Sequence, residues 1–138
     1  MAAPSTANRP TPERIFNTLN AFEQTAALRT AIELDVFTAI GAGANTPAAI
    51  AAKTGAAEKG ARALCDYLTI HGFLNKDQGK YALTQESAIF LDRKSPACLA
   101  SMTGFLGTER ARSIFDSLTL AVRNGGSVWS GGRQHQTQ

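Results

Sequence analysis

The feature that most constrains the fold is the order of short elements in the segment 46–84. Its letters read TPAAIAAKTGAAEKGARALCDYLTIHGFLNKDQGKYALT. Thr46 and Pro47 have the chemistry of a helix start, and Gly55 has that of a helix end. A second helix is predicted over about 57–70. An apolar pair, a polar turn and a second apolar run follow it, as in a hairpin. The segment therefore predicts a winged helix-turn-helix with a short two-stranded β-wing.

Composition favours one mainly α domain. The chain has 138 residues, of which 43% are hydrophobic and 18% are charged. These proportions are typical of globular proteins, and this length suffices for one modest core. Alanine is plentiful while valine and isoleucine are few, which favours helix over strand. We predict a flexible leader over 1–10, a winged-helix dimerisation domain over 11–126, and a flexible tail or linker remnant over 127–138.

A helical arm is predicted before the winged segment. Thr11 is expected to cap its first helix, with Pro12 at the first helical position. Steps of four and three then place four apolar residues on one helical face: Ile15, Leu19, Phe22 and Ala26. A further apolar stretch continues to the glycine at 41. The arm has more apolar residues than one small core absorbs, so we expect a second chain to cover it. The predicted dimer interface is Ile15, Phe16, Leu19, Phe22 and Ala26.

Three more helices are predicted after the wing. The first runs over 84–91, the second starts at Pro96, and the last covers about 108–123. The last helix is expected to bury Ile114, Phe115, Leu118 and Val122. A candidate wall for a pocket that takes a flat apolar ligand consists of Met102, Phe105 and Trp129. Core packing is the favoured interpretation for the first two of these and a pocket shared with a further domain is the alternative, while simple exposure is the plain interpretation for the third.

No catalytic constellation is recognised along the chain. The Gly-Ala-Gly run at 41–43 follows a predicted helix rather than a strand, so it does not fit a dinucleotide loop. His71 is expected to cap the helix that ends at 70. His135 has no Asp or Cys near it in sequence with which to form a base or a ligand set. We therefore assign no catalytic, cofactor-binding or metal-binding residue.

The two cysteines and the N-terminal composition bear on the cellular compartment. Cys65 and Cys98 have neither zinc-ligand nor disulfide-framework spacing, so we predict two buried thiols in a reducing compartment. The first residues lack an apolar signal core, and no apolar run approaches the length of a membrane span. These features predict a cytoplasmic protein that does not enter a membrane.

Binding to DNA is the familiar use of a winged helix, and the charges argue against it. The net charge is +3, but the segment 46–91 carries five basic side chains against four acidic ones. Lys59 and Arg62 on the second helix, with Lys76 and Lys80 on the wing, would make only a few phosphate contacts. A small dimeric winged-helix transcription regulator that binds DNA therefore remains the alternative hypothesis, and DNA is the less favoured partner.

The order of elements resembles the N-terminal dimerisation domain of S-adenosylmethionine-dependent small-molecule O-methyltransferases. The matching stretches are ALRTAIELDVFTAI, TPAAIAAKTG, ALCDYLTIHGFL with KYALT, ESAIFL, and FDSLTLAVRNGGSVW. The resemblance covers about residues 12–130. It implies a homodimer formed by intertwined N-terminal helices, in which each domain contributes to the pocket for an acceptor such as a phenol or a carboxylate.

The resemblance also implies a following Rossmann-like domain that binds S-adenosylmethionine and supplies the catalytic base. No unit of that kind is recognised before Gln138, so we expect the chain to be the front half of a methyltransferase. It would hold no cofactor and have no activity alone. A shortened gene product, an isolated domain and an orphan domain are all compatible with this expectation. A regulatory subunit that caps a separate methyltransferase is a third hypothesis.

Overall fold

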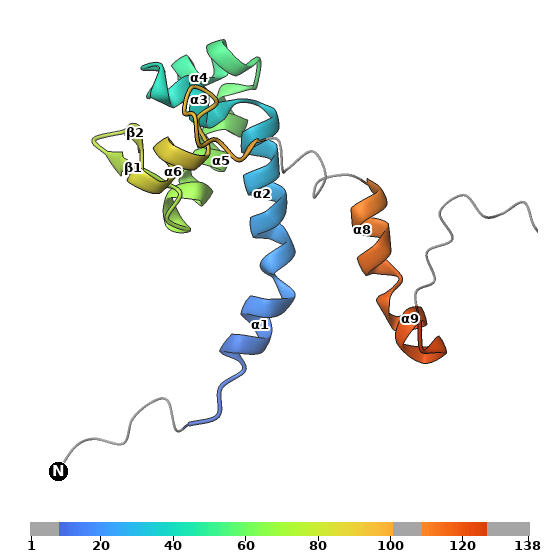
Figure 1. The fold of residues 1–138 in the computed structure, drawn as a ribbon. Helices are drawn as coiled ribbons and strands as arrows, with labels where there is room; N and C mark the ends of the chain where they lie inside the picture. Colours follow the sequence, from blue (N-terminus) through green and yellow to red (C-terminus); the bar gives the residue numbers. More distant parts are fainter. Residues whose placement is uncertain (1–8, 101–108, 127–138) are drawn as a thin grey trace, which may run out of the picture.

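The structure is a computed structural model that describes residues 9–100 and 109–126. Its helices and strands follow in the order α1 (Glu13–Leu19), α2 (Ala21–Glu33), α3 (Val36–Gly41), α4 (Pro47–Thr54), α5 (Glu58–Ile70), β1 (Leu74–Asp77), β2 (Lys80–Leu83), α6 (Gln85–Phe90), α8 (Glu109–Asp116) and α9 (Leu118–Asn124). Figure 1 shows a rounded body formed by α3 to α6 and the hairpin, from which α1 and much of α2 project as an arm. The mainly helical fold with a two-stranded wing is confirmed.

The helix-turn-helix of the body forms where the sequence predicts it. The hydroxyl of Thr46 accepts a hydrogen bond from the backbone N–H of Ala49 at 3.2 Å and so caps α4. Gly55 ends α4 with φ of +79°, a left-handed conformation that favours glycine. The connection 55–57 leads into α5, which presents its apolar side to the core, with Ala61, Cys65 and Leu68 buried.

The wing is an antiparallel hairpin in which Leu74 lies opposite Leu83 and Asp77 opposite Lys80. Its two turn residues, Gln78 and Gly79, have φ of +50° and +77°. Two consecutive positive values define a type I′ turn, whose twist matches that of the flanking strands. The strand after the turn is also tied to the body, because the N–H of Tyr81 donates to the carbonyl of Asn45 at 2.8 Å.

The core lies where the end of α2 meets α3, α4, α5 and the hairpin. Ser87 at its edge is fully buried, and its hydroxyl donates to the carbonyl of Phe73 at 2.7 Å, which satisfies the buried oxygen. The buried apolar cluster comprises Ala31, Ile32, Val36, Phe37, Ile40, Ile50, Ala61, Cys65, Leu68, Leu74, Tyr81 and Ala100. None of these residues comes from α1 or from the first half of α2. This part of the arm therefore adds nothing to the core.

The arm differs from the prediction in its helix ends. The N-cap of α1 is Pro12 rather than Thr11, because the carbonyl of Pro12 is the first to accept a helical bond, from the N–H of Phe16 at 2.9 Å. The apolar run to the glycine at 41 also forms three helices. They are separated at Asn20 and at Asp35, whose φ of +60° is left-handed. Aspartate visits that conformation more readily than most residues, so it can turn the chain between α2 and α3.

The segment after the wing is confirmed at its start and corrected further on. Thr84 caps α6 by accepting the N–H of Ser87 at 3.2 Å, as predicted. Pro96 lies in a turn and does not start a helix, because the side chain of Ser95 bonds the next N–H, that of Ala97, at 3.3 Å. The single helix predicted over 108–123 is interrupted at Ser117, which separates α8 from α9.

Candidate dimerisation surface

The arm presents a continuous apolar face to solvent. The exposed fractions are 62% for Ile15, 57% for Phe16, 63% for Leu19 and 68% for Phe22. Ala26 is exposed at the end of the same face. In α1 no residue is buried. Exposure of several large apolar side chains in one stripe is rare on a monomer and marks a surface that another chain covers.

A second exposed apolar surface lies on α8 and α9, where the sequence predicts core packing. The prediction is wrong for all four residues, with exposed fractions of 41% for Ile114, 71% for Phe115, 57% for Leu118 and 73% for Val122. These helices are short, and among the described elements α8 packs mainly on α9. Two short helices cannot bury an amphipathic face between themselves, so the face stays open in one chain.

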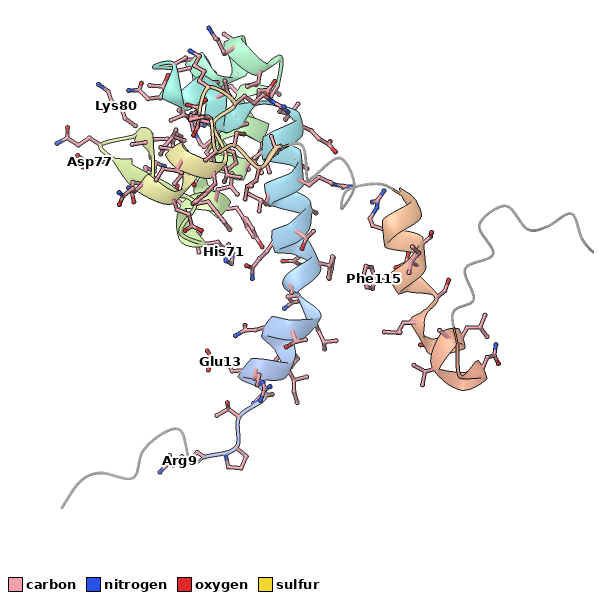
Figure 2. All side chains as sticks on the ribbon, in the orientation of Figure 1. Arg9, Glu13, His71, Asp77, Lys80 and Phe115 are labelled. Atoms are coloured by element: carbon pink, nitrogen blue, oxygen red, sulfur yellow. The ribbon has the colours of Figure 1, made fainter. Side chains whose placement is uncertain are left out.

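A hollow of about 450 Å³ lies between α2 and α8. Phe115 occupies the side of α8 that is turned toward α2 (Figure 2). The α2 wall continues the stripe of the arm, and two arginines and an aspartate also line the hollow. The lining residues are Phe22, Thr25, Ala26, Arg29, Arg112, Phe115 and Asp116. The structure thus brings two predicted interface residues, Phe22 and Ala26, to an open apolar hollow.

Two pairs of charged side chains form on the winged body. Asp66 on α5 accepts hydrogen bonds from Lys76 at 2.8 Å and from Tyr81 at 2.6 Å. The bonds from Lys76 and Tyr81 lower the pKa of the Asp66 carboxyl. Arg62 pairs with Glu58 at 3.3 Å. Two of the four cations considered for DNA contacts therefore have carboxylate partners, while Asp77 and Lys80 lie at the tip of the wing (Figure 2).

An ion pair at the joint between arm and body was missed by the sequence reasoning. The guanidinium of Arg93, in the loop after α6, bonds the carboxylate of Asp35 and the carbonyl of Ile32, the latter at 3.3 Å. The hydrogen bond that Arg93 donates to the Asp35 carboxylate, with the charge of that carboxylate, raises the pKa of Arg93. The backbone N–H of Arg93 also donates to Thr38 at 3.1 Å. The loop thereby clasps the end of α2 and the start of α3, at the point where the arm leaves the body.

Other predicted sites have mixed outcomes. His71 is the C-cap of α5, but the observed bond is made by its backbone N–H, to Tyr67 at 3.1 Å, and its ring contacts the Tyr67 ring. Cys65 is buried as predicted, and burial raises its thiol pKa to about 11. Cys98 is only partly buried. The candidate pocket wall of Met102, Phe105 and Trp129 lies outside the described residues.

Within residues 9–100 and 109–126, no group of three or more His, Cys, Asp or Glu side chains could hold a metal ion. No helix in the same ranges has both the length and the apolar character needed to cross a membrane.

Comparison with solved structures finds methyltransferases. A putative O-methyltransferase from Nostoc punctiforme PCC 73102 shares 43% identity, with a TM-score of 0.84, over 88% of this chain and 37% of its own. Human N-acetylserotonin methyltransferase, solved with SAM, shares 27% identity, with a TM-score of 0.74, over 88% and 37%. PigF with SAH shares 26% identity, with a TM-score of 0.75, over 84% and 34%. The chain spans about a third of the length of these proteins.

Comparison with curated proteins finds no match. Comparison with protein families matches residues 16–93 to the O-methyltransferase dimerisation domain. The matched range begins within α1, covers the whole winged body and ends at Arg93, the residue that clasps the joint. It includes more than half of the chain, and it confirms the resemblance drawn from the order of elements. The chain belongs to the O-methyltransferase dimerisation domain family.

Proposed function

We propose that this chain forms a homodimer through α1 and the first half of α2 and serves as the dimerisation unit of an S-adenosylmethionine-dependent O-methyltransferase. The observation that carries the proposal is the apolar stripe of the arm, whose four large side chains are each more than half exposed. Membership of a dimerisation family supports a second copy as the cover. In a two-fold dimer the same patch on both chains is buried, so one exposed stripe per chain is enough to form the interface.

The test is a single charge placed in the stripe. Phe22→Asp should convert the dimer to monomer, because an unpaired charge buried in the interface costs roughly 3–5 kcal/mol. Light scattering on purified protein reads the mass directly. Ile70→Asp is the matched control, since Ile70 is 79% exposed on α5 of the body. Ile70→Asp should leave the dimer intact, and an unchanged dimer in Phe22→Asp would remove the arm from the interface.

We further propose that the domain shapes the acceptor pocket and leaves methyl-donor binding to another part of the enzyme. Support comes from the family match, which assigns residues 16–93 to dimerisation. Met102, Phe105 and Trp129 remain the predicted wall for the acceptor. Calorimetric titration of the chain with S-adenosylmethionine should show no saturable heat. Saturable micromolar binding would mean that the chain holds the donor itself.

The regulator hypothesis is distinguished by a separate measurement. Arg62 and Lys76 are engaged with Glu58 and Asp66, which leaves the winged face less suited to phosphates. A gel shift on DNA at physiological salt should therefore show only weak, salt-sensitive retardation. Specific nanomolar binding would reverse the ranking in favour of a transcription regulator.

A further inference from the structure

The arm joins the body through the connection 34–35, where Asp35 is left-handed with φ of +60° and ψ of +36°. Aspartate adopts this conformation more readily than most residues. The backbone of Asp35 bonds both helices, because its N–H donates to the carbonyl of Ile32 at 3.1 Å and its carbonyl accepts the N–H of Ala39 at 2.9 Å. A change in the conformation of Asp35 would therefore change the angle between α2 and α3.

Arg93 holds both sides of this connection from a distant part of the chain. Its guanidinium bonds the carboxylate of Asp35 and the carbonyl of Ile32. Its backbone N–H donates to the hydroxyl of Thr38 at 3.1 Å. The last turn of α2 has no basic side chain of its own, so Arg93 supplies the positive charge that favours a helix C-terminus. One residue thus contacts the end of α2, the connection and the start of α3.

The loop that carries Arg93 has hydrogen bonds of its own. The side chain of Asp92 accepts the N–H of Lys94 at 3.0 Å, and the carbonyl of Asp92 accepts the N–H of Ser95 at 2.9 Å. The carboxylate of Asp92 also lies against Gly41 at the end of α3, where an added Cβ would collide with it. The loop therefore rests on the body and holds Arg93 in place beside the connection.

Small rotations at the connection become large displacements along the arm. The buried residues of α2 are Ala31 and Ile32, so core packing holds only the last turns of this helix. Ile15 lies roughly 25 Å further along at 1.5 Å per residue, and turning the arm by about 10° would displace it by roughly 4 Å. Such a displacement is close to the spacing of neighbouring side chains on a helix. Two stripes can therefore pack on each other only when both arms point in the matching direction.

We propose that Arg93 is a positioning residue for dimerisation, which holds the arm in the direction that lets the stripe meet a second copy. This inference rests on the proposed homodimer and adds what orients its interface. An exposed ion pair shifts a population by a factor of only about two to five. The apparent dissociation constant of the dimer, however, is divided by the fraction of correctly directed arms once for each chain. A fall of that fraction to about a third would weaken the dimer roughly tenfold.

Sedimentation equilibrium of the full chain measures this effect on the dimer. Arg93→Ala should raise the dissociation constant roughly tenfold. Asp35→Asn should raise it too, because asparagine also tolerates the left-handed conformation but lacks the charge that Arg93 bonds. Lys94→Ala is the matched control, since it removes the same charge from the next residue of the loop, and it should leave the dissociation constant unchanged. An unchanged constant in Arg93→Ala would overturn the positioning role.

The direction of the arm is measured separately in a monomer. In the Phe22→Asp chain with Cys98→Ser, spin labels on Asn17→Cys of α1 and Lys53→Cys of α4 report the distance between arm and body. Both labelled positions are exposed. Cys65 stays unlabelled because it is buried and its pKa is raised to about 11.

Adding Arg93→Ala to the labelled monomer should broaden the distribution of distances, and adding Lys94→Ala should leave it as narrow as before. An equally narrow distribution with Arg93→Ala would overturn the positioning role, and so would a broader distribution together with an unchanged dimer. A parent chain that sediments as a monomer would instead overturn the proposed homodimer, whereas a loss of the Arg93 effect from both measurements would leave the homodimer standing.

Discussion

Asp66 connects the second helix of the winged body to the wing through one carboxylate oxygen, which accepts both the Lys76 ammonium and the Tyr81 hydroxyl. The ammonium also lies 5.1 Å from the centre of the Tyr81 ring. The Tyr81 ring is 2% exposed and fills part of the core. Burial, with the adjacent Asp66 charge, raises the pKa of Tyr81 to about 12. The bond from Tyr81 to Asp66 therefore stabilises the wing only while the phenol keeps its proton.

The sign of the resulting pH dependence follows from that shift. The folded chain prefers neutral Tyr81, so its contribution is fully present below the ordinary tyrosine pKa of 10.0 and is lost as pH rises through about 12. Tyr81→Phe should lower the unfolding free energy at neutral pH by about 1 kcal/mol, the usual worth of one hydrogen bond. It should also flatten the alkaline decline between these two pKa values. Urea unfolding of both chains across that range measures the two effects.

Tyr67→Phe is the control for that comparison, because it removes a hydroxyl from α5 without touching the bond between Tyr81 and Asp66. It should leave the alkaline decline as steep as in the parent chain. Equal slopes for the parent and Tyr81→Phe would mean that the phenol of Tyr81 ionises alike in the folded and unfolded chains. The cluster would then have no part in the alkaline loss of stability.

At the scale of elements, local chemistry decides where the body's helices and turns lie. The caps at Thr46 and Thr84 and the stop at Gly55 act within a few residues, so their sequence signals predicted α4 and α6 correctly. The breaks at Asp35 and Ser117 carry no comparable local signal. Asp35 is held in its left-handed conformation beside Arg93, which lies far along the chain, so only the folded structure reveals it.

Replacing glycine by alanine should change the stability of the chain in opposite directions at two positions of the winged body. Gly79 has φ of +77° in the wing turn, whereas Gly60 lies within α5 and an added Cβ there would meet nothing within 4 Å. Gly79→Ala should destabilise the chain by about 1 kcal/mol or more, because alanine is strained at positive φ. Gly60→Ala should stabilise it by up to about 1 kcal/mol through helix propensity. Thermal unfolding of both variants checks this, and equal shifts would contradict the type I′ turn.

At the scale of the whole molecule, a large share of the apolar surface is left for another chain. The winged body has a closed core, while α1, the start of α2, α8 and α9 keep their large side chains exposed. The clasp of Arg93 on Asp35 holds the loop after α6 against the joint where the arm begins. The contacts of Arg93 thus connect the body to the arm at the place where the arm begins.

In the proposed homodimer the second copy stabilises the arm. The thermal stability of the chain should therefore depend on protein concentration. The thermal midpoint of the parent chain should rise with protein concentration, because association favours the folded state by mass action. The midpoint of Phe22→Asp should not change with concentration. Differential scanning calorimetry over a hundredfold dilution measures both. A parent midpoint that stays constant over this range would show that folding does not depend on the second copy.

The sequence by itself determined the winged body, because its caps, its glycine turn and its periodic apolar residues all act over short distances. It also identified the arm's stripe, since Ile15, Leu19, Phe22 and Ala26 follow a helical period whether or not a partner is present. Periodicity shows that a face is apolar without showing what covers it. Only the tertiary structure decided that α8 and α9 leave their apolar face open and that Arg93 clasps Asp35. Both features depend on groups that the fold brings together, or fails to bring together, across long stretches of chain.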